Sequence, residues 1–187
     1  MSTWRNAPPL TNSQRTELRE GLLVEYAPGL VVPADLAATA CLRGALLAPL
    51  LPAGYTAVTL TALWIHTGWW PTARMRQLYA AHPARTKPPA SHRRTIPRAF
   101  TSEAGGTRLT TPARTAADLL IMEQADVAVE GILLLLGGQL SIGELQEQLS
   151  LEKGRRSLPF AREMAKALNE YLAWRTRALT RRIATDR

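Results

Sequence analysis

The stretch from His82 to Arg98 constrains the fold most, because four prolines fall within its 17 residues. Proline has no backbone N–H to donate and breaks helices, so this stretch cannot form a helix or a central strand. We expect an exposed loop that returns to a strand near Ala99–Thr101. The loop is also basic, and its candidate contacts to an acidic partner or to DNA are Arg85, Lys87, Arg93, Arg94 and Arg98.

The first 34 residues predict a helix followed by a hairpin. Asn12 or Ser13 is positioned to cap a short helix. The β-rich runs Leu22–Tyr26 and Leu30–Val32 flank Pro28-Gly29, which suits the centre of a type II turn. A winged helix ends in this order, but it needs about two more helices before this point. We therefore interpret residues 1–34 as a truncated or remnant winged-helix-like segment.

Between residues 35 and 122 the pattern alternates between helix and strand. The predicted elements are a helix over Leu36–Leu47 with Asp35 as its cap, a helix around Leu60–Thr67 closed by Gly68, a strand over Met75–Ala81, and a strand over Thr107–Thr110 after a turn at Gly105-Gly106. A further helix starts with Thr111 as cap and Pro112 at its first position, where the missing N–H has no partner to lose.

Helices dominate the remainder of the sequence. The run Val127–Leu136 after Asp126 is apolar on nearly every side, which predicts a central helix. Ser141 and Glu144 form a capping box for the next helix, and Ser157 is positioned to cap a long last helix. We expect a mixed fold of the α/β (α+β) class, with a small mixed sheet packed by several helices and a long C-terminal helix.

The net charge of +8 is concentrated in two blocks. Residues 1–71 are neutral, 72–115 carry +8, 116–153 carry −6 and 154–187 carry +6. Such lopsided blocks favour a binding role, with nucleic acid, an acidic protein face or an anionic surface as partner. The composition, 46% hydrophobic and 20% charged, is typical of a packed globular protein.

The chain has one cysteine, Cys41, which excludes an intramolecular disulfide and a cysteine-based metal site. Because Cys41 lies in an apolar helical run, we expect an inert core thiol. The N-terminus has no apolar core of signal-peptide length, and the longest purely apolar run is Ile132–Leu136. These features predict a cytoplasmic protein that does not enter a membrane.

No segment carries a recognised catalytic motif, so we expect no enzymatic activity, no metal and no cofactor. His66 lies within an apolar helix and is interpreted as a hydrogen-bonded core histidine. Glu123, Asp126 and Glu130 are the nearest approach to a nuclease-like carboxylate cluster, but helix-face acids are more often solvated surface. Trp69 and Trp70 are expected in core packing or, as the alternative, on a partner surface.

The segment LTTPARTAADLL, Leu109–Leu120, carries a motif of eight residues: Leu109, Thr110, Pro112, Ala113, Arg114, Thr115, Asp118 and Leu119. It resembles the L-T-x-P-A-R-T-x-x-D-L segment of AbiEi-type antitoxins, which belong to AbiE bacterial toxin–antitoxin systems. Upstream, TLTALWIHTGWW is similar to a family helix through Ala62, Trp64, His66 and Gly68. Downstream, SIGEL and then Gly154, Arg155 and Ala161 follow in the family's order, so that the resemblance covers roughly residues 36–182.

The resemblance implies an antitoxin-like protein whose residues 35–187 form the C-terminal antitoxin domain and whose partner is a nucleotidyltransferase-like toxin. Family proteins usually also bind operator DNA through an N-terminal winged helix. A DNA-binding transcriptional (auto)repressor is therefore the alternative, and a degenerate nuclease is a weaker one. The oligomeric state stays open.

Two sets of residues are the candidate sites. The first set, on the resemblance, comprises the signature residues Trp64, His66, Pro112, Arg114, Thr115 and Asp118. The second set adds basic residues to those of the loop as contacts to a partner or to DNA: Arg114, Arg155, Arg156, Arg175, Arg181 and Arg182. Arg114 and Asp118, four apart, also suit a helix-surface ion pair, and the C-terminal arginines also suit a solvated helix end.

Overall fold

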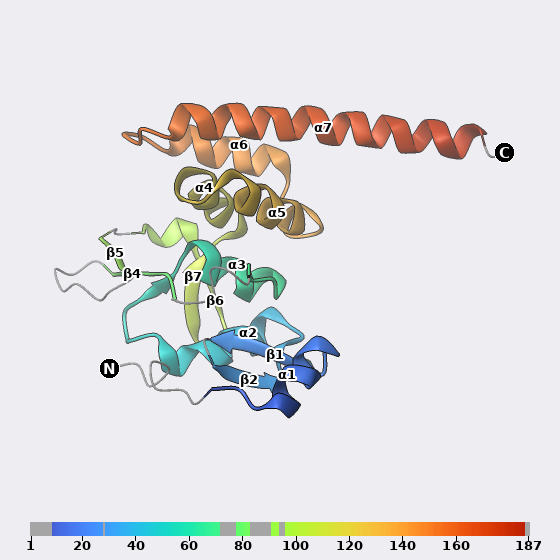
Figure 1. Cartoon of the computed structure of the whole chain (residues 1–187). Helices are drawn as coiled ribbons and strands as arrows, with labels where there is room; N and C mark the ends of the chain where they lie inside the picture. Colours follow the sequence, from blue (N-terminus) through green and yellow to red (C-terminus); the bar gives the residue numbers. More distant parts are fainter. Residues whose placement is uncertain (1–8, 28, 72–77, 83–90, 94–95, 186–187) are drawn as a thin grey trace. The chain divides into compact units, whose positions relative to one another are not determined.

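A computed structural model describes residues 9–27, 29–71, 78–82, 91–93 and 96–185, and of these it leaves the side chains of 82, 91–93 and 179–185 undescribed. Its fold is mixed α+β with small sheets and a long C-terminal helix, as the sequence predicted (Figure 1). The chain divides into two compact units, residues 1–115 and residues 116–187.

Unit 1 begins with a helix and a hairpin, as predicted. Helix α1 spans Asn12–Arg19, and its cap is Thr11, in a capping box with Gln14, rather than Asn12 or Ser13. Strands β1 (Leu23–Ala27) and β2 (Leu30–Pro33) pair antiparallel. Gly29 adopts the positive φ of +74° that the turn requires, and its N–H donates to the Glu25 carboxylate at 2.7 Å. Pro28 lies outside the described residues.

Unit 1 also contains a five-stranded mixed sheet, in the order β5-β4-β3-β7-β6. Its strands are β3 (Thr56–Ala57), β4 (Ala80–His82), β5 (Ser91–Arg93), β6 (Thr101–Ala104) and β7 (Thr107–Thr110). Strands β3 and β7 are parallel, as are β4 and β5, whereas β3 pairs antiparallel with β4 and β6 with β7.

Two strand predictions were wrong in their bounds. The strand expected over Met75–Ala81 is β4, which begins at Ala80, while residues 72–77 lie outside the described residues. The predicted loop His82–Arg98 contains β5, and the strand expected near Ala99 starts only at Thr101, after a 3-10 turn over Arg98–Phe100. Strand β5 lies at the edge of the sheet. Proline is tolerated near an edge strand, because one side of that strand forms no hydrogen bonds within the sheet.

The helix expected from Asp35 starts later. Asp35 lies in a 3-10 turn, Ala34–Ala37, and the helix α2 spans Ala40–Leu47 with Thr39 as its cap. A second 3-10 turn, Ala48–Leu50, follows directly. Cys41 is exposed on α2, which contradicts the expected core thiol, because the buried side of this short helix is formed by Arg43, Gly44 and Leu47.

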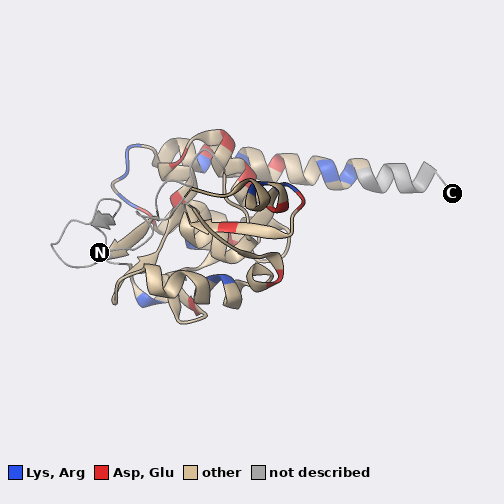
Figure 2. Ribbon diagram, turned by 60° about the horizontal axis from the view of Figure 1, so that its bottom comes forward, with Lys and Arg blue, Asp and Glu red and all other residues tan. Residues whose placement is uncertain are grey.

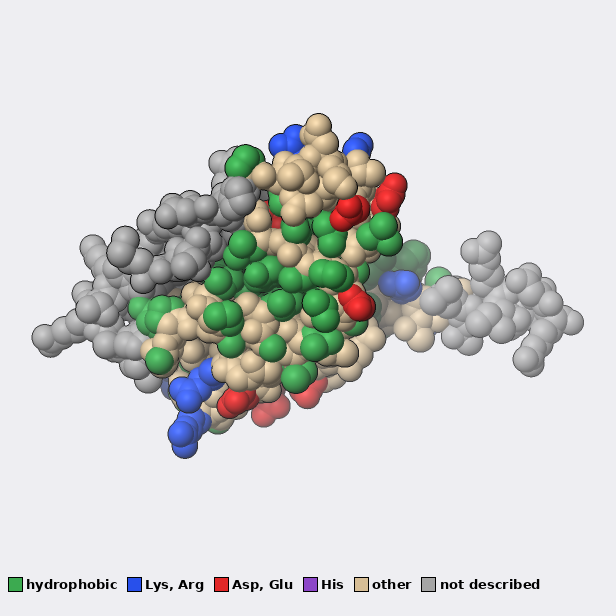
Figure 3. All heavy atoms as spheres, turned by 90° about the horizontal axis from the view of Figure 1, so that it is seen from below, with side chains coloured by type: hydrophobic (Ala, Val, Ile, Leu, Met, Phe, Trp, Pro, Cys, Tyr) green, Lys and Arg blue, Asp and Glu red, His purple; other side chains and the backbone are tan. Residues whose placement is uncertain are grey.

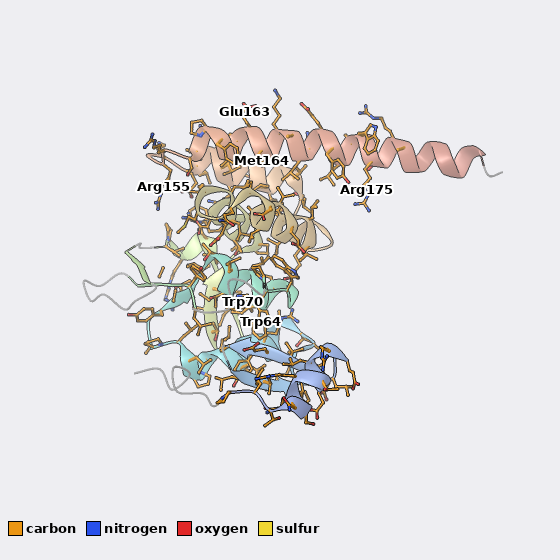
Figure 4. All side chains as sticks on the ribbon, in the orientation of Figure 1. Trp64, Trp70, Arg155, Glu163, Met164 and Arg175 are labelled. Carbon is orange, nitrogen blue, oxygen red and sulfur yellow. The ribbon has the colours of Figure 1, made fainter. Side chains whose placement is uncertain are left out.

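Helix α3 (Thr59–Thr67) matches its prediction, and Gly68 closes it in the left-handed conformation. It is buried on all sides from Thr59 to His66, and Trp64 lies at the centre of the core of unit 1 with Leu47, Ile65 and Leu109. Trp70 packs near Trp64, with ring centroids 6.3 Å apart (Figure 4). Trp70 therefore takes the core role that we favoured over a partner surface.

Helix α2 lies directly against the β6–β7 hairpin, because glycine removes the side chain at the contact. A Cβ atom on Gly44 would overlap the backbone of Ala104. The Thr107 hydroxyl donates to the Gly44 carbonyl at 2.7 Å and fixes the approach. Gly105, in the hairpin turn, has the same role against the backbone of Ala45.

Unit 2 is helical. Helix α4 (Pro112–Met122) starts at Pro112, as predicted, and its first turn still belongs to unit 1. It is followed by α5 (Ala125–Leu136), α6 (Ile142–Leu151) and α7 (Leu158–Thr185). The prediction that α5 is central was wrong, because it buries only Ala128, Gly131, Ile132 and Leu135 and leaves Leu133 and Leu134 exposed. Among the described residues, no helix is long and apolar enough to cross a membrane.

Helices α6 and α7 pack together along one apolar stripe of each helix. Leu158, Ala161, Ala165 and Leu168 are buried on α7, and Leu145 and Leu149 on α6. The Ser141–Glu144 capping box of α6 is confirmed. The Ser157 hydroxyl, at the start of α7, donates to the Ile121 carbonyl at 2.9 Å, which ties α7 to the end of α4.

We predict that Gly44→Ala lowers the free energy of unfolding by about 2 kcal/mol, because the new methyl group forces α2 away from the hairpin. Urea denaturation measures this change. The matched control is Gly143→Ala on α6, where the nearest atom to the new Cβ is 3.9 Å away. That substitution should leave stability unchanged or raise it by up to about 1 kcal/mol. Equal losses in both variants would contradict the close approach.

Candidate functional site

Signature residues from distant segments meet at the end of β7. His66 on α3 is 7% exposed, and its Nε2–H donates to the Thr110 carbonyl at 2.8 Å. The carbonyl can only accept, so the proton lies on Nε2. His66 is thus a hydrogen-bonded core histidine, as predicted. Desolvation by burial lowers its pKa, the hydrogen bond to Thr110 partly opposes this, and the nearby Arg43 charge lowers it further.

Two threonines extend this contact into the start of α4. The hydroxyl oxygens of Thr110 and Thr115 lie 2.7 Å apart, and the Thr115 hydroxyl also reaches the Thr110 carbonyl at 3.2 Å. Both side chains are fully buried. The Thr111 hydroxyl accepts from the Arg114 N–H at the helix start, at a long 3.4 Å. The end of β7 and the first turn of α4 are therefore held to α3 by buried polar contacts.

Arg43, which the sequence did not point to, anchors the same C-terminal end of α3 from another side. Its Nε donates to the Ile65 carbonyl at 2.8 Å and its Nη2 to the His66 carbonyl at 2.9 Å. Its Nη1 donates to the carbonyls of Ala37 and Ala38 at 2.8 and 3.1 Å. The side chain is 6% exposed, and desolvation lowers its pKa. A cation at the C-terminal end of a helix also favours the helix dipole.

Arg114 and Asp118 are buried, with 4% and 2% of their surface exposed. The surface location expected for these two residues is therefore wrong, because both side chains are buried. The Arg114 guanidinium carbon lies 5.8 Å from the centre of the Phe100 ring, within the range of a cation–π contact. This placement favours a structural role for Arg114 over a contact to a partner or to DNA.

The remaining basic candidates lie apart from this network. Arg98, Arg155, Arg156 and Arg175 are exposed. Figure 2 shows basic residues on the loop before α7 and along α7, and Figure 4 labels Arg155 and Arg175 there. Arg85, Lys87 and Arg94 lie outside the described residues, as do the side chains of Arg93 on β5 and of Arg181 and Arg182 on α7.

The acidic candidates are dispersed. Asp126 and Glu130 are exposed on α5, and Glu123 is half-buried before it. Within the described part of the chain, no group of three His, Cys, Asp or Glu side chains is arranged to hold a metal ion.

Two surface features of unit 1, a polar groove and an apolar face, were not predicted from the sequence. A polar groove of about 410 Å³ lies beside the β6–β7 hairpin, lined among others by Tyr55, Glu103 and Arg108. Hydrophobic side chains gather on the face that contains α1, β1 and β2 (Figure 3), and the large exposed ones in unit 1 are Leu22, Leu36 and Leu42. Both depend on tertiary packing, since their residues are distant in the sequence.

Comparisons with protein-family models, with curated proteins and with solved structures find no match to this chain.

We predict that acid destabilises the protein partly through His66. Its pKa is lowered on folding, so the unfolded state binds the proton first, and this stability is lost as the pH falls below about 6.5. Between pH 7.5 and 5.5 the loss through this one group should be at most about 1 kcal/mol. In His66→Gln the amide can still donate to the Thr110 carbonyl but does not titrate. The contribution of residue 66 to the loss of stability between the two pH values should therefore vanish in this variant. Urea denaturation of both proteins at the two pH values measures it, and equal losses would contradict the account.

Proposed function

We propose that this chain is an antitoxin-like protein that acts in the cytoplasm by binding a nucleotidyltransferase-like toxin. One observation carries the proposal. The resemblance to AbiEi-type antitoxins rests on separate segments, around Trp64–Gly68 and Leu109–Leu120, and these hydrogen-bond to each other through His66 and Thr110. A motif whose parts meet in one buried network is expected of a domain signature, and this supports assigning both segments to one antitoxin domain.

The buried signature supports the fold, so the partner is bound elsewhere. Arg98, Arg155, Arg156 and Arg175 present exposed guanidinium groups. Guanidinium groups form charge-assisted, often bidentate hydrogen bonds with carboxylates, which suits an acidic face on the toxin. Arg155 and Arg156 are adjacent on a loop whose backbone turns at Gly154, with φ of +68°. We propose this pair as the main electrostatic contact with the toxin.

A DNA-binding repressor is the second candidate function. The observation that favours it is the order α1, β1, β2, which matches the last helix and wing of a winged helix. Helix α1 buries none of its residues and exposes Arg15 and Arg19. These two arginines are the phosphate contacts that this alternative requires.

We predict that co-expression with a nucleotidyltransferase-like toxin encoded beside this protein restores growth and that the two proteins co-purify. Arg155→Glu/Arg156→Glu should weaken the complex about 10-fold or more, because reversing the charge replaces attraction with repulsion. The matched control is Arg15→Glu/Arg19→Glu, which makes the same charge change on α1. The control should still rescue growth and bind the toxin, with Kd measured by calorimetry.

The two functions separate in the same experiment. Loss of binding to the protein's own promoter in the α1 variant, with rescue intact, would establish the repressor as an additional function. No rescue against a neighbour that is demonstrably toxic would contradict the antitoxin proposal. Rescue with a complex that resists both double substitutions would leave the antitoxin function standing and reject Arg155 and Arg156 as its contact.

A further inference from the structure

Helix α7 carries a second apolar stripe, distinct from the one that packs on α6. Its members are Phe160, Met164, Ala167, Tyr171, Trp174 and Ala178. Their spacing alternates strictly between four and three residues, which is the heptad repeat of a coiled coil, with Met164, Tyr171 and Ala178 at a and Phe160, Ala167 and Trp174 at d. Because an α-helix has 3.6 residues per turn, residues spaced alternately three and four apart all lie on one side of it.

Among the described residues of unit 2, this second stripe has no packing partner. Phe160, Tyr171 and Trp174 expose 53%, 46% and 60% of their surface, Ala167 and Ala178 are exposed, and only Met164 is half-buried. The stripe that packs on α6 comprises Leu158, Ala161, Ala165 and Leu168, all buried. Figure 1 shows α7 continuing well past the end of α6. The Tyr171 and Trp174 rings contact each other in this exposed stretch, 6.1 Å apart.

The residues beside the stripe divide by charge along the helix. The g positions are Glu163 and Glu170 in the first part and Arg177 in the last part, and Arg175 is at an e position. A parallel partner would place Arg175 against the Glu170 of the second copy, twice, but would give Glu163 and Arg177 no partner of opposite charge. An antiparallel partner places Arg177 against the Glu163 of the second copy, twice, by symmetry. Charge complementarity thus fits a second copy of this chain, and each orientation forms two ion pairs by symmetry.

Side-chain volume decides between the two orientations and favours the antiparallel one. With the twofold axis beside Asn169, each a residue faces a d residue of the second copy. Tyr171 then faces Ala167, Ala178 faces Phe160, and Met164 faces Trp174. Two of the three kinds of layer pair an aromatic ring with alanine, so large and small side chains interdigitate. A parallel pair would stack each aromatic residue on its own copy and each alanine on its own copy.

We propose that α7 forms an antiparallel, two-helix dimer interface with a second copy of this chain through Phe160, Met164, Ala167, Tyr171, Trp174 and Ala178. The interface extends over about 27 Å of helix, which is short, so the dimer forms in the range of about 10–100 µM. This inference is independent of the antitoxin proposal, because it needs neither a toxin nor DNA.

The first test is sedimentation equilibrium of the full chain up to about 100 µM, with a reductant present because Cys41 is exposed. We expect a monomer–dimer equilibrium that Trp174→Lys weakens about 10-fold or more. Trp174 is exposed, so the variant should keep its fold, as circular dichroism will verify. The matched control is Ala173→Lys, an exposed position on the opposite side of α7, which should leave the equilibrium unchanged. A monomer at every concentration, or equal effects of the two variants, would overturn the proposal.

The second test is a charge exchange that reports orientation. Glu163 and Arg177 lie about 21 Å apart along one helix, so they cannot pair within a chain. Glu163→Arg should weaken the dimer, and Glu163→Arg/Arg177→Glu should restore it. Glu170 faces its own copy in the antiparallel pair but faces Arg175 in a parallel one. Glu170→Gln should therefore tighten the dimer about 2-fold or more. Weakening by Glu170→Gln, or no rescue by the double variant, would overturn the antiparallel arrangement.

Discussion

The Arg43 guanidinium is the interaction on which the rest of unit 1 depends. It joins the C-terminal end of α3 to the chain just before α2, through four carbonyl oxygens. Carbonyls at a helix end need partners when buried, and a single planar cation with five N–H groups supplies them. With that end fixed, His66 is held where its Nε2 reaches the Thr110 carbonyl, which sets the start of α4.

The structure separates residues that hold the fold from residues available for binding. His66, Thr110, Thr115, Arg114 and Asp118 are buried. The exposed arginines lie on the loop before α7 and on α7 itself, among other places. A sequence motif can therefore identify a domain while its residues never touch the partner.

The sequence predicted the elements whose signals are local. Helix α3 with Gly68 as its stop, the α6 capping box and the β1–β2 hairpin each depend on residues within a few positions of one another. It failed where the deciding contact is tertiary. The role of Arg43 could not be predicted from its neighbours in the sequence, because its acceptors on α3 are 22 and 23 residues away. Asp35 and Thr39 are both residue types that cap helices well, so propensity alone does not show that α2 begins only after Thr39.

The predictions for the candidate site show the same limit. The core role of His66 followed from its apolar surroundings and is confirmed. The burial of Arg114 and Asp118 was missed, because an arginine and an aspartate four residues apart suggest a solvated helix face. The second stripe on α7 was hidden in a helix that already had one apolar side. Only the burial of Leu158, Ala161, Ala165 and Leu168 reveals that the other stripe lacks a partner.

The central claim is that one buried cation organises unit 1, and the free energy of unfolding of Arg43→Met tests it most directly. Methionine keeps much of the aliphatic volume but donates no hydrogen bonds, so the carbonyls of Ile65 and His66 lose their partner. The account predicts a loss of about 2–4 kcal/mol, measured by urea denaturation at pH 7.5. A loss below about 0.5 kcal/mol, the size of an ordinary surface substitution, would contradict it.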